Sequence, residues 1–226
     1  MADLIIAAPK RSRSTLRVLV GLLLCYGAPA WAREFSADLV RTQVGTAPVP
    51  AGRLIVHGDN VRIETPELPD GFFLIDGAKP AAYFVRPATH LYMDARQSSR
   101  LTGWFVPVDP DDPCRQWQAM VRQAGGADPG DLRCERVGEE IIGGRRLIGY
   151  RVVAGASEQF LGWIDPTDGL PLQIKTRDGD IVSVENIQDA PQPLPLLQVP
   201  QGFRKFDPEM ILRQVRQSDV WVAPPE

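Results

Sequence analysis

The chain has 226 residues, of which 44% are hydrophobic and 23% are charged, and its net charge at pH 7 is −3. A mildly acidic chain without a cluster of basic residues lacks the electrostatic footprint of a nucleic-acid-binding protein, so nucleic acid is excluded as a partner. The 21 Pro and 20 Gly favour many short strands joined by turns over long helices.

The first 32 residues have the pattern of a secretory signal peptide, which predicts a periplasmic protein. Basic residues between Lys10 and Arg17 precede the apolar run 18–24, and Ala30-Trp31-Ala32 is an A-x-A cleavage site. The apolar run is shorter than the roughly 20 residues that span a bilayer. Cleavage before Arg33 changes the net charge to about −6 and leaves residues 33–226 as one domain. A lipid anchor at Cys25 is the alternative, but lipoprotein processing needs a small residue where this chain has Leu24.

The mature chain begins with segments of period-two alternation, which predict β-strands. The clearest pair covers 52–57 and 60–64, because Gly58-Asp59-Asn60 joins the two segments into a hairpin. Further strands are predicted over 34–43, 72–77, 81–87 and 90–94. One face of this sheet is apolar and needs a cover or a ligand. The residues that we predict to line a ligand cavity on that face are Leu54, Val56, Val61, Ile63, Phe73, Ile75, Tyr83 and Val85.

Residues 98–112 are predicted to be irregular. Within them, Trp104 and Phe105 either fill the edge of the core or, as exposed aromatic residues, anchor to a membrane or line the mouth of a pocket. Asp109, Asp111 and Asp112 lack the spacing of an EF-hand. We interpret them as loop and helix-cap residues, with calcium ligands as the alternative.

An amphipathic helix is predicted over 114–124, because Asp112-Pro113 is a start signal and Gly125-Gly126 is a stop signal. Cys114, Trp117 and Val121 share one face of it at helical spacing. The helix is expected to cover the sheet, as a fixed part of the core or as a mobile lid. Trp117 therefore joins the candidate cavity residues.

Cys114 and Cys134 are the cysteines that remain after cleavage of the signal peptide. In an oxidising compartment we expect them to form a structural disulfide. A redox pair usually has C-x-x-C spacing, and a metal site needs further ligands nearby, so both alternatives are less consistent with this sequence.

The second half predicts a meander of antiparallel strands. Strands are expected over 134–142, 145–154, 157–164, 170–175 and 181–187, followed by a proline-rich link and a short helix over 209–217. The absence of strand–helix alternation argues against a parallel α/β sheet. This many strands should curl. The expected class is mainly β (α+β): a curled antiparallel half-barrel of about ten or eleven strands with two or three helices over its concave face.

The sequence contains no recognisable catalytic or cofactor-binding constellation. His57 and His90 each stand alone in strand-like contexts, and no G-x-S-x-G, H-E-x-x-H or glycine-rich phosphate loop is present. Glu139 and Glu140 are neighbours in one strand and therefore face opposite sides. We predict no catalytic residue, no metal site and no cofactor, and hence no enzyme.

The order of several short motifs resembles a family of exported bacterial domains of unknown function that is similar to the LolA/LolB-like periplasmic lipoprotein carriers. The most distinctive motifs are Gly58-Asp-Asn-Val-Arg-Ile-Glu64, the pair Cys114 and Cys134, and Val199-Pro-Gln-Gly-Phe203. The resemblance covers nearly the whole mature chain. It implies an eleven-stranded half-barrel that holds acyl chains or another apolar ligand against its concave side. Where the carriers have an arginine followed by a proline, this chain has His57-Gly58-Asp59-Asn60, so no ligand-binding residue is carried over.

Two functions follow as hypotheses. The first is a monomeric periplasmic protein that binds a lipid or the acyl chains of a lipoprotein in the half-barrel. The alternative is a structural or signalling protein of the envelope that binds a protein partner, for which Trp104-Phe105 and the link 191–195 are the candidate contacts. A hydrolase, the third class, lacks an acid–base constellation.

Overall fold

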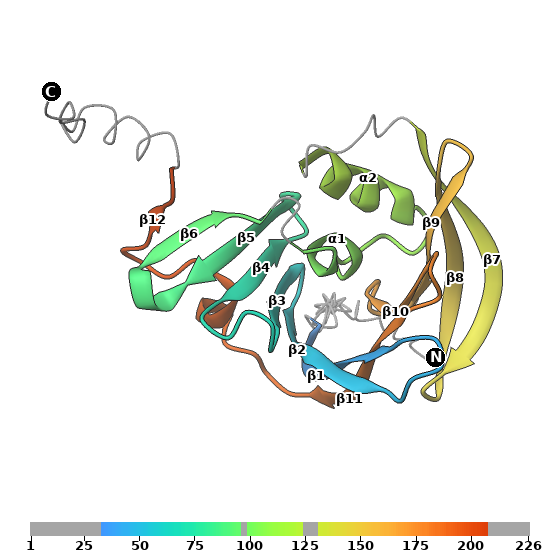
Figure 1. Ribbon diagram of the computed structural model, residues 1–226, viewed down its shortest axis with the longest axis horizontal. Helices are drawn as coiled ribbons and strands as arrows, with labels where there is room; N and C mark the ends of the chain where they lie inside the picture. The colour runs from blue at the N-terminus through green and yellow to red at the C-terminus, as the bar shows by residue number, and fades with distance from the viewer. Residues whose placement is uncertain (1–32, 96–98, 124–130, 208–226) are drawn as a thin grey trace, which may run out of the picture. The chain divides into compact units, whose positions relative to one another are not determined.

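A computed structural model describes residues 33–95, 99–123 and 131–207. The predicted signal peptide with Cys25 and the helix expected over 209–217 lie outside the described residues. The described elements form one sheet, antiparallel except at its β12 edge, with two α-helices (Figure 1). The strands are β1 (Glu34–Thr42), β2 (Val49–His57), β3 (Asn60–Glu64), β4 (Phe72–Asp76), β5 (Ala81–Arg86), β6 (Leu91–Asp94), β7 (Leu132–Ile142), β8 (Arg145–Ala154), β9 (Ser157–Ile164), β10 (Pro171–Thr176), β11 (Ile181–Asp189) and β12 (Arg204–Lys205).

The strand order confirms a mainly β half-barrel, with twelve strands where ten or eleven were expected. The order is β12-β6-β5-β4-β3-β2-β1-β11-β10-β9-β8-β7. Two meanders, β1–β6 and β7–β11, join where β1 pairs with β11. The extra strand is the two-residue β12, which pairs in parallel with β6. β12 is too short to show period-two alternation. Only its pairing with β6 defines it as a strand, so the sequence did not predict it.

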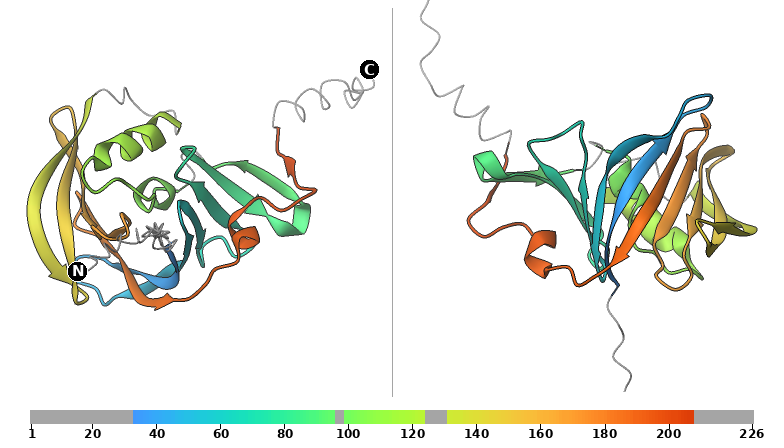
Figure 2. Two further views of the ribbon diagram at one scale, coloured as in Figure 1. Left: turned by 180° about the vertical axis from the view of Figure 1, so that it is seen from behind. Right: turned by 90° about the horizontal axis from the view of Figure 1, so that it is seen from below.

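Both helices lie on the concave side of the curled sheet (Figures 1 and 2). They are α1 (Leu101–Trp104) and α2 (Pro113–Gln123). The segment that joins them is buried, with Phe105, Val106 and Val108 at most 4% exposed. The predicted helix over 114–124 is therefore confirmed within the described residues, whereas the four-residue α1 falls in a region expected to be irregular.

A second layer covers part of the convex face. After β11, the chain forms the 3₁₀ helix η3 (Leu194–Leu197) and then β12 (Figure 2). We call residues 190–206 the strap. Val199 and Phe203 of the strap pack against a small apolar cluster of Phe72, Leu74 and Val85. The proline-rich link thus covers the outside of the sheet.

Polar contacts fix the strap to the sheet. The side chain of Arg62 donates to the carbonyl oxygen of Leu196 over 3.1 Å and lies 3.5 Å above the ring of Phe72. At the edge of the sheet, the backbone N–H of Phe206 donates to the carbonyl oxygen of Tyr92 over 2.7 Å. This pairing covers the edge of β6, whose backbone N–H and C=O groups would otherwise lack hydrogen-bond partners in the sheet.

Among the described residues, no helix combines the length and the apolar character that a membrane crossing needs.

Candidate functional site

Most of the residues predicted to line a cavity form the centre of the core. Leu54, Val56, Val61 and Ile63 are completely buried, and Phe73, Ile75 and Trp117 are at most 2% exposed. They belong to one large cluster that also includes Phe105 and Val106 from the segment between the helices. The helices and their connection therefore occupy the middle of the concave face, and a cavity can form only beside them.

Tyr83 and Val85 point to the opposite face, contrary to the expectation that they share the face of Leu54. The register pairs Phe72 with Val85 and Leu74 with Tyr83, so these four residues project to one side of the sheet. Val85 is completely buried there beneath the strap. Residues 81–85 are apolar on both faces, so alternation alone could not decide which side faces inward.

A cavity of about 970 Å³ lies at the rim of the concave face, between β5–β6 on one side and β9 on the other. Of the predicted residues, Trp117 and Tyr83 line it, and Tyr83 does so from the rim of the sheet although its side chain projects to the convex face. Its apolar wall comes from both helices and two strands: Trp104, Trp117, Met120, Val121, Leu132 and Phe160. This volume falls within the range of small-molecule binding sites.

Three aromatic rings make the most continuous part of this wall. The ring centroids of Trp117 and Phe160 are 5.2 Å apart in an edge-to-face arrangement, and those of Trp104 and Phe160 are 6.3 Å apart. Trp104, Trp117 and Phe160 come from α1, α2 and β9, respectively. Such an aromatic wall presents a large apolar surface to a ligand.

The indole of Trp117 packs directly against Gly162 of β9. A Cβ atom at this position would lie 3.1 Å from Cη2 and 3.3 Å from Cζ2 of the indole. A larger residue would therefore push the indole away from the sheet. The glycine lets α2 approach β9 closely and fixes the depth of the cavity beside it.

Charged side chains surround the mouth of the cavity. Asp94 and Lys205 form an ion pair of 2.9 Å, and this hydrogen bond to Asp94 raises the pKa of Lys205. Glu158 pairs with Arg151 over 3.0 Å. Four more charged residues that line the cavity are exposed: Arg100, Asp131, Arg177 and Asp178.

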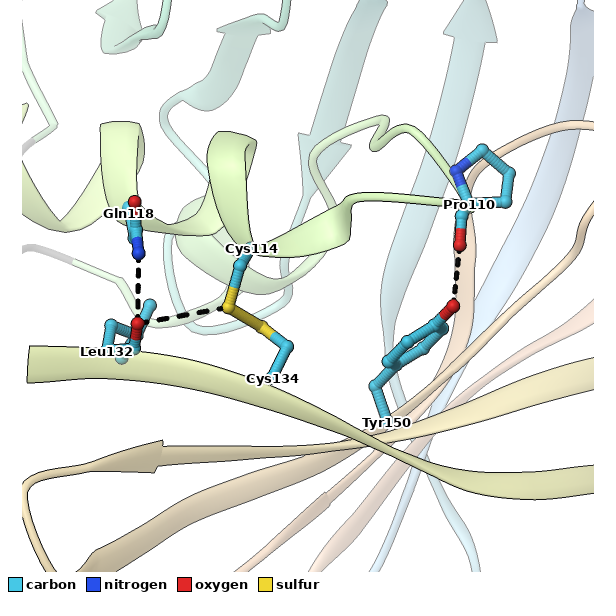
Figure 3. Close-up of a disulfide and its surroundings, with 6 residues drawn as sticks. All are labelled: Pro110, Cys114, Gln118, Leu132, Cys134 and Tyr150. Carbon is cyan, nitrogen blue, oxygen red and sulfur yellow. Dashed lines mark hydrogen bonds between the residues drawn. A yellow bond between two sulfur atoms is a disulfide. The ribbon is translucent and has the colours of Figure 1, made fainter.

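Three contacts hold α2 and the residues before it against β7 and β8 (Figure 3). Cys114 and Cys134 form the expected disulfide, with their Cα atoms 5.6 Å apart. The side chain of Gln118 donates a hydrogen bond to the carbonyl oxygen of Leu132 over 2.9 Å. The hydroxyl of Tyr150 donates a hydrogen bond to the carbonyl oxygen of Pro110 over 2.6 Å. Trp117, Met120 and Val121 of the tethered helix line the cavity, so these contacts fix one of its walls.

The remaining sequence candidates have structural contacts. Nδ1 of His57 lies 2.9 Å from the carbonyl oxygen of Gln192, and the ring of His90 packs against Phe203. Asp109 accepts hydrogen bonds from Arg115 and from the backbone of Asp111. In the part of the chain that the structure describes, no three His, Cys, Asp or Glu side chains are grouped to hold a metal ion.

A buried charge cluster lies away from the cavity, at the turn between β9 and β10. Asp165, 5% exposed, accepts hydrogen bonds from Arg145 over 3.0 Å and from the backbone of Thr167 over 2.8 Å. Burial disfavours the charge of Arg145, but the hydrogen bond and the charge of Asp165 outweigh it and raise the pKa of Arg145. Burial raises the pKa of Asp168, the charge of Asp165 raises it further, and Arg145 partly opposes both effects.

The raised pKa of Asp168 predicts a pH-dependent effect on stability. The folded protein retains the Asp168 proton to a higher pH than the unfolded chain does, so this group lowers stability as pH rises through that interval. We expect Asp168→Asn to raise the free energy of unfolding at pH 7 and to leave it unchanged at pH 3, below the unfolded pKa of about 3.9. Urea denaturation of the wild type and the variant at pH 7 and at pH 3 measures the change in the free energy of unfolding.

The matched control for Asp168→Asn is Asp165→Asn. It removes the carboxylate that holds Arg145 and Thr167, so stability should fall at pH 7. A loss of stability in Asp168→Asn at pH 7 that is absent at pH 3 would contradict the prediction, because it would mean that the ionised carboxylate stabilises the fold.

Sequence reasoning missed most of the cavity wall. Trp104 was considered for a pocket mouth, but Phe160 and Met120 were interpreted only as parts of predicted elements, and Leu132 lay before the strand predicted over 134–142. Arg100 and Arg177 gave no local signal, since charged residues are common in turns. These residues meet only because the curled sheet brings β5, β9 and β12 to the same opening.

No protein-family model and no curated protein sequence matches this chain. Among solved structures, PNGF-II matches with a TM-score of 0.50 and 6% identity over 82% of this chain and 34% of its own. MucB, also solved from Pseudomonas aeruginosa in complex with MucA, matches with a TM-score of 0.41 and 16% identity over 74% and 57% of the two chains. A putative outer membrane lipoprotein-sorting protein domain from Vibrio parahaemolyticus matches with a TM-score of 0.31 and 9% identity over 80% and 90%.

These comparisons do not assign the chain to a protein family. The chain spans about a third of PNGF-II and little more than half of MucB, and at these identities the PNGF-II match shows a shared fold alone. The lipoprotein-sorting domain and MucB are among the structural neighbours of the chain, at low identity.

Proposed function

We propose that this chain is a non-enzymatic periplasmic binding protein that holds the apolar part of a lipid or of lipoprotein acyl chains in the rim cavity. The cavity of about 970 Å³ carries this proposal, because it lies beside a filled core and Trp104, Trp117 and Phe160 are among the apolar residues that line it. The disulfide fits an oxidising compartment such as the periplasm.

The ligand site in this proposal differs from the one expected from the sequence. The inner faces of β2, β3 and β4 are covered by the segment around Phe105, which is fully buried. The disulfide and the bond between Tyr150 and Pro110 hold that segment in place. The ligand therefore occupies the space beside α2, while Leu54, Ile63 and their neighbours support the sheet beneath it.

Gly103 provides a direct test of this proposal. It lines the cavity within α1, and a Cβ atom there would meet no other atom within 4 Å. Gly103→Trp should fill the cavity without displacing its wall and weaken binding of the fluorescent apolar probe N-phenylnaphthylamine at least tenfold, about 1.4 kcal/mol. Gly103→Ala is the matched control and should bind the probe like the wild type.

Two outcomes would overturn this proposal. The first is equal probe binding by Gly103→Trp and Gly103→Ala. The second is the absence of any lipid adduct when the protein purified from the periplasm is examined by native mass spectrometry, together with no binding of the probe by the wild type.

The alternative, a protein that docks an envelope partner, keeps one of the two contacts that motivated it. Phe105 is completely buried and Trp104 packs against the core, whereas residues 191–195 lie mostly exposed in the strap on the convex face. Crosslinking in the envelope distinguishes the two functions: recovery of a defined protein partner and no lipid would favour the alternative.

A further inference from the structure

The charges at the cavity mouth divide into those that are already neutralised and those that are not. Lys205 pairs with Asp94, and Glu158 pairs with Arg151. Within the described residues, the side chains of Arg100, Arg177, Asp131 and Asp178 line the same cavity and form no ion pair. The unpaired charges are two of each sign, so the mouth has no net preference for a cation or an anion.

Three separate segments carry these four charges. Arg100 precedes α1, Asp131 precedes β7, and Arg177 and Asp178 occupy the turn between β10 and β11. That turn is closed by backbone hydrogen bonds from Gly179 to Thr176 and from Thr176 to Asp180. The four side chains form no ion pairs with one another. A bound molecule that carries one positive and one negative group can therefore pair with side chains of both signs.

We propose that the natural ligand is an amphiphile with a zwitterionic phosphate–ammonium head group. Arg100 and Arg177 bind the phosphate, because guanidinium groups match phosphate oxygens in geometry and charge. Asp131 and Asp178 bind the ammonium group, and the acyl chain lies against Trp104, Trp117 and Phe160. This inference rests on the proposed function and adds the chemical class of the ligand.

The test compares four amphiphiles with the same twelve-carbon chain at concentrations below micelle formation. Dodecylphosphocholine is zwitterionic, dodecyl sulfate is anionic, dodecyltrimethylammonium is cationic and dodecyl maltoside is neutral. Exposed charge pairs contribute about 0.2–1 kcal/mol each. We therefore expect dodecylphosphocholine to bind about tenfold more tightly than dodecyl maltoside in isothermal titration calorimetry at low salt, and this advantage should shrink at high salt.

Charge-neutralising variants assign the head-group contacts. The double variant Arg100→Gln with Arg177→Gln should remove most of the advantage of dodecylphosphocholine and leave dodecyl maltoside binding unchanged. Asp131→Asn with Asp178→Asn should do the same, and in addition shift the preference toward dodecyl sulfate. Arg146→Gln with Lys175→Gln removes two exposed charges that do not line the cavity and is the matched control.

The outcomes separate this inference from the function on which it rests. If dodecyl maltoside binds as tightly as dodecylphosphocholine, or if dodecyl sulfate binds more tightly than both, the zwitterionic head group is wrong while apolar binding stands. If none of the four amphiphiles binds, both proposals fail. An equal loss of dodecylphosphocholine binding in the control variant would also overturn the assignment of the four residues.

Discussion

Gly52→Ala is expected to destabilise the fold by about 3 kcal/mol or more. Gly52 has a backbone φ of +150°, a conformation that side-chain-bearing residues rarely adopt. A Cβ atom at this position would lie far inside contact distance of the backbone carbonyl oxygen of Glu64. The conformational cost of about 1–3 kcal/mol adds to an overpacking cost of about 1–3 kcal/mol.

The location of Gly52 explains why the sheet cannot relax around the added methyl group. It lies where the register between β1 and β2 shifts, since Leu39 pairs with Gly52 and Val40 pairs with Pro50. β2 also pairs with β3 on its other side, so both neighbours are fixed. A displacement here would disturb the centre of the sheet beneath α1 and α2.

Gly58→Ala is the matched control for this prediction. Gly58 has a φ of +57° in the turn between β2 and β3, and a Cβ atom there would meet no atom within 4 Å. Its cost should be limited to the backbone term of about 1–2 kcal/mol. Urea denaturation of the two variants at constant m-value measures the difference, and equal losses would show that the contact with Glu64 is relieved at little cost.

The sequence predicted the local elements of this fold well, because their signals are local. Gly58-Asp59-Asn60, Gly143-Gly144 and the turn at Gly179 each join strands that pair as expected. The helix after Asp112 and its disulfide to Cys134 followed from capping residues and from the cysteine count. In each case, a few neighbouring residues determine the outcome.

The candidate site could not be predicted in the same way, because it depends on contacts between distant segments. The faces of Tyr83 and Val85 were decided by the strap, whose Val199 and Phe203 cover an apolar cluster on the convex side. The filling of the concave face was decided by Phe105, which sequence alone left open between core and surface. Once that segment occupied the middle of the sheet, the cavity could form only at the rim.

Trp117→Ala should have the second large effect, a destabilisation of about 3–5 kcal/mol. The indole is 2% exposed, packs edge to face with Phe160 and rests on Gly162. Its removal leaves a void between α2 and β9 that the disulfide prevents the helix from closing. Denaturation with and without dodecylphosphocholine, at a concentration below micelle formation, measures both the loss and the stabilisation by ligand.

Trp117→Phe distinguishes the packing of the ring from its unpaired donor. The substitution keeps an aromatic ring against Phe160 and removes Nε1, which has no hydrogen-bond partner among the described residues. Because a buried unpaired donor costs about 1–3 kcal/mol, its removal should offset part of the lost contact, and Trp117→Phe should lose less than half as much stability as Trp117→Ala. Because Nε1 is buried and the aromatic ring is kept, dodecylphosphocholine should stabilise Trp117→Phe as much as the wild type. A loss of stability in Trp117→Phe as large as in Trp117→Ala would contradict this prediction.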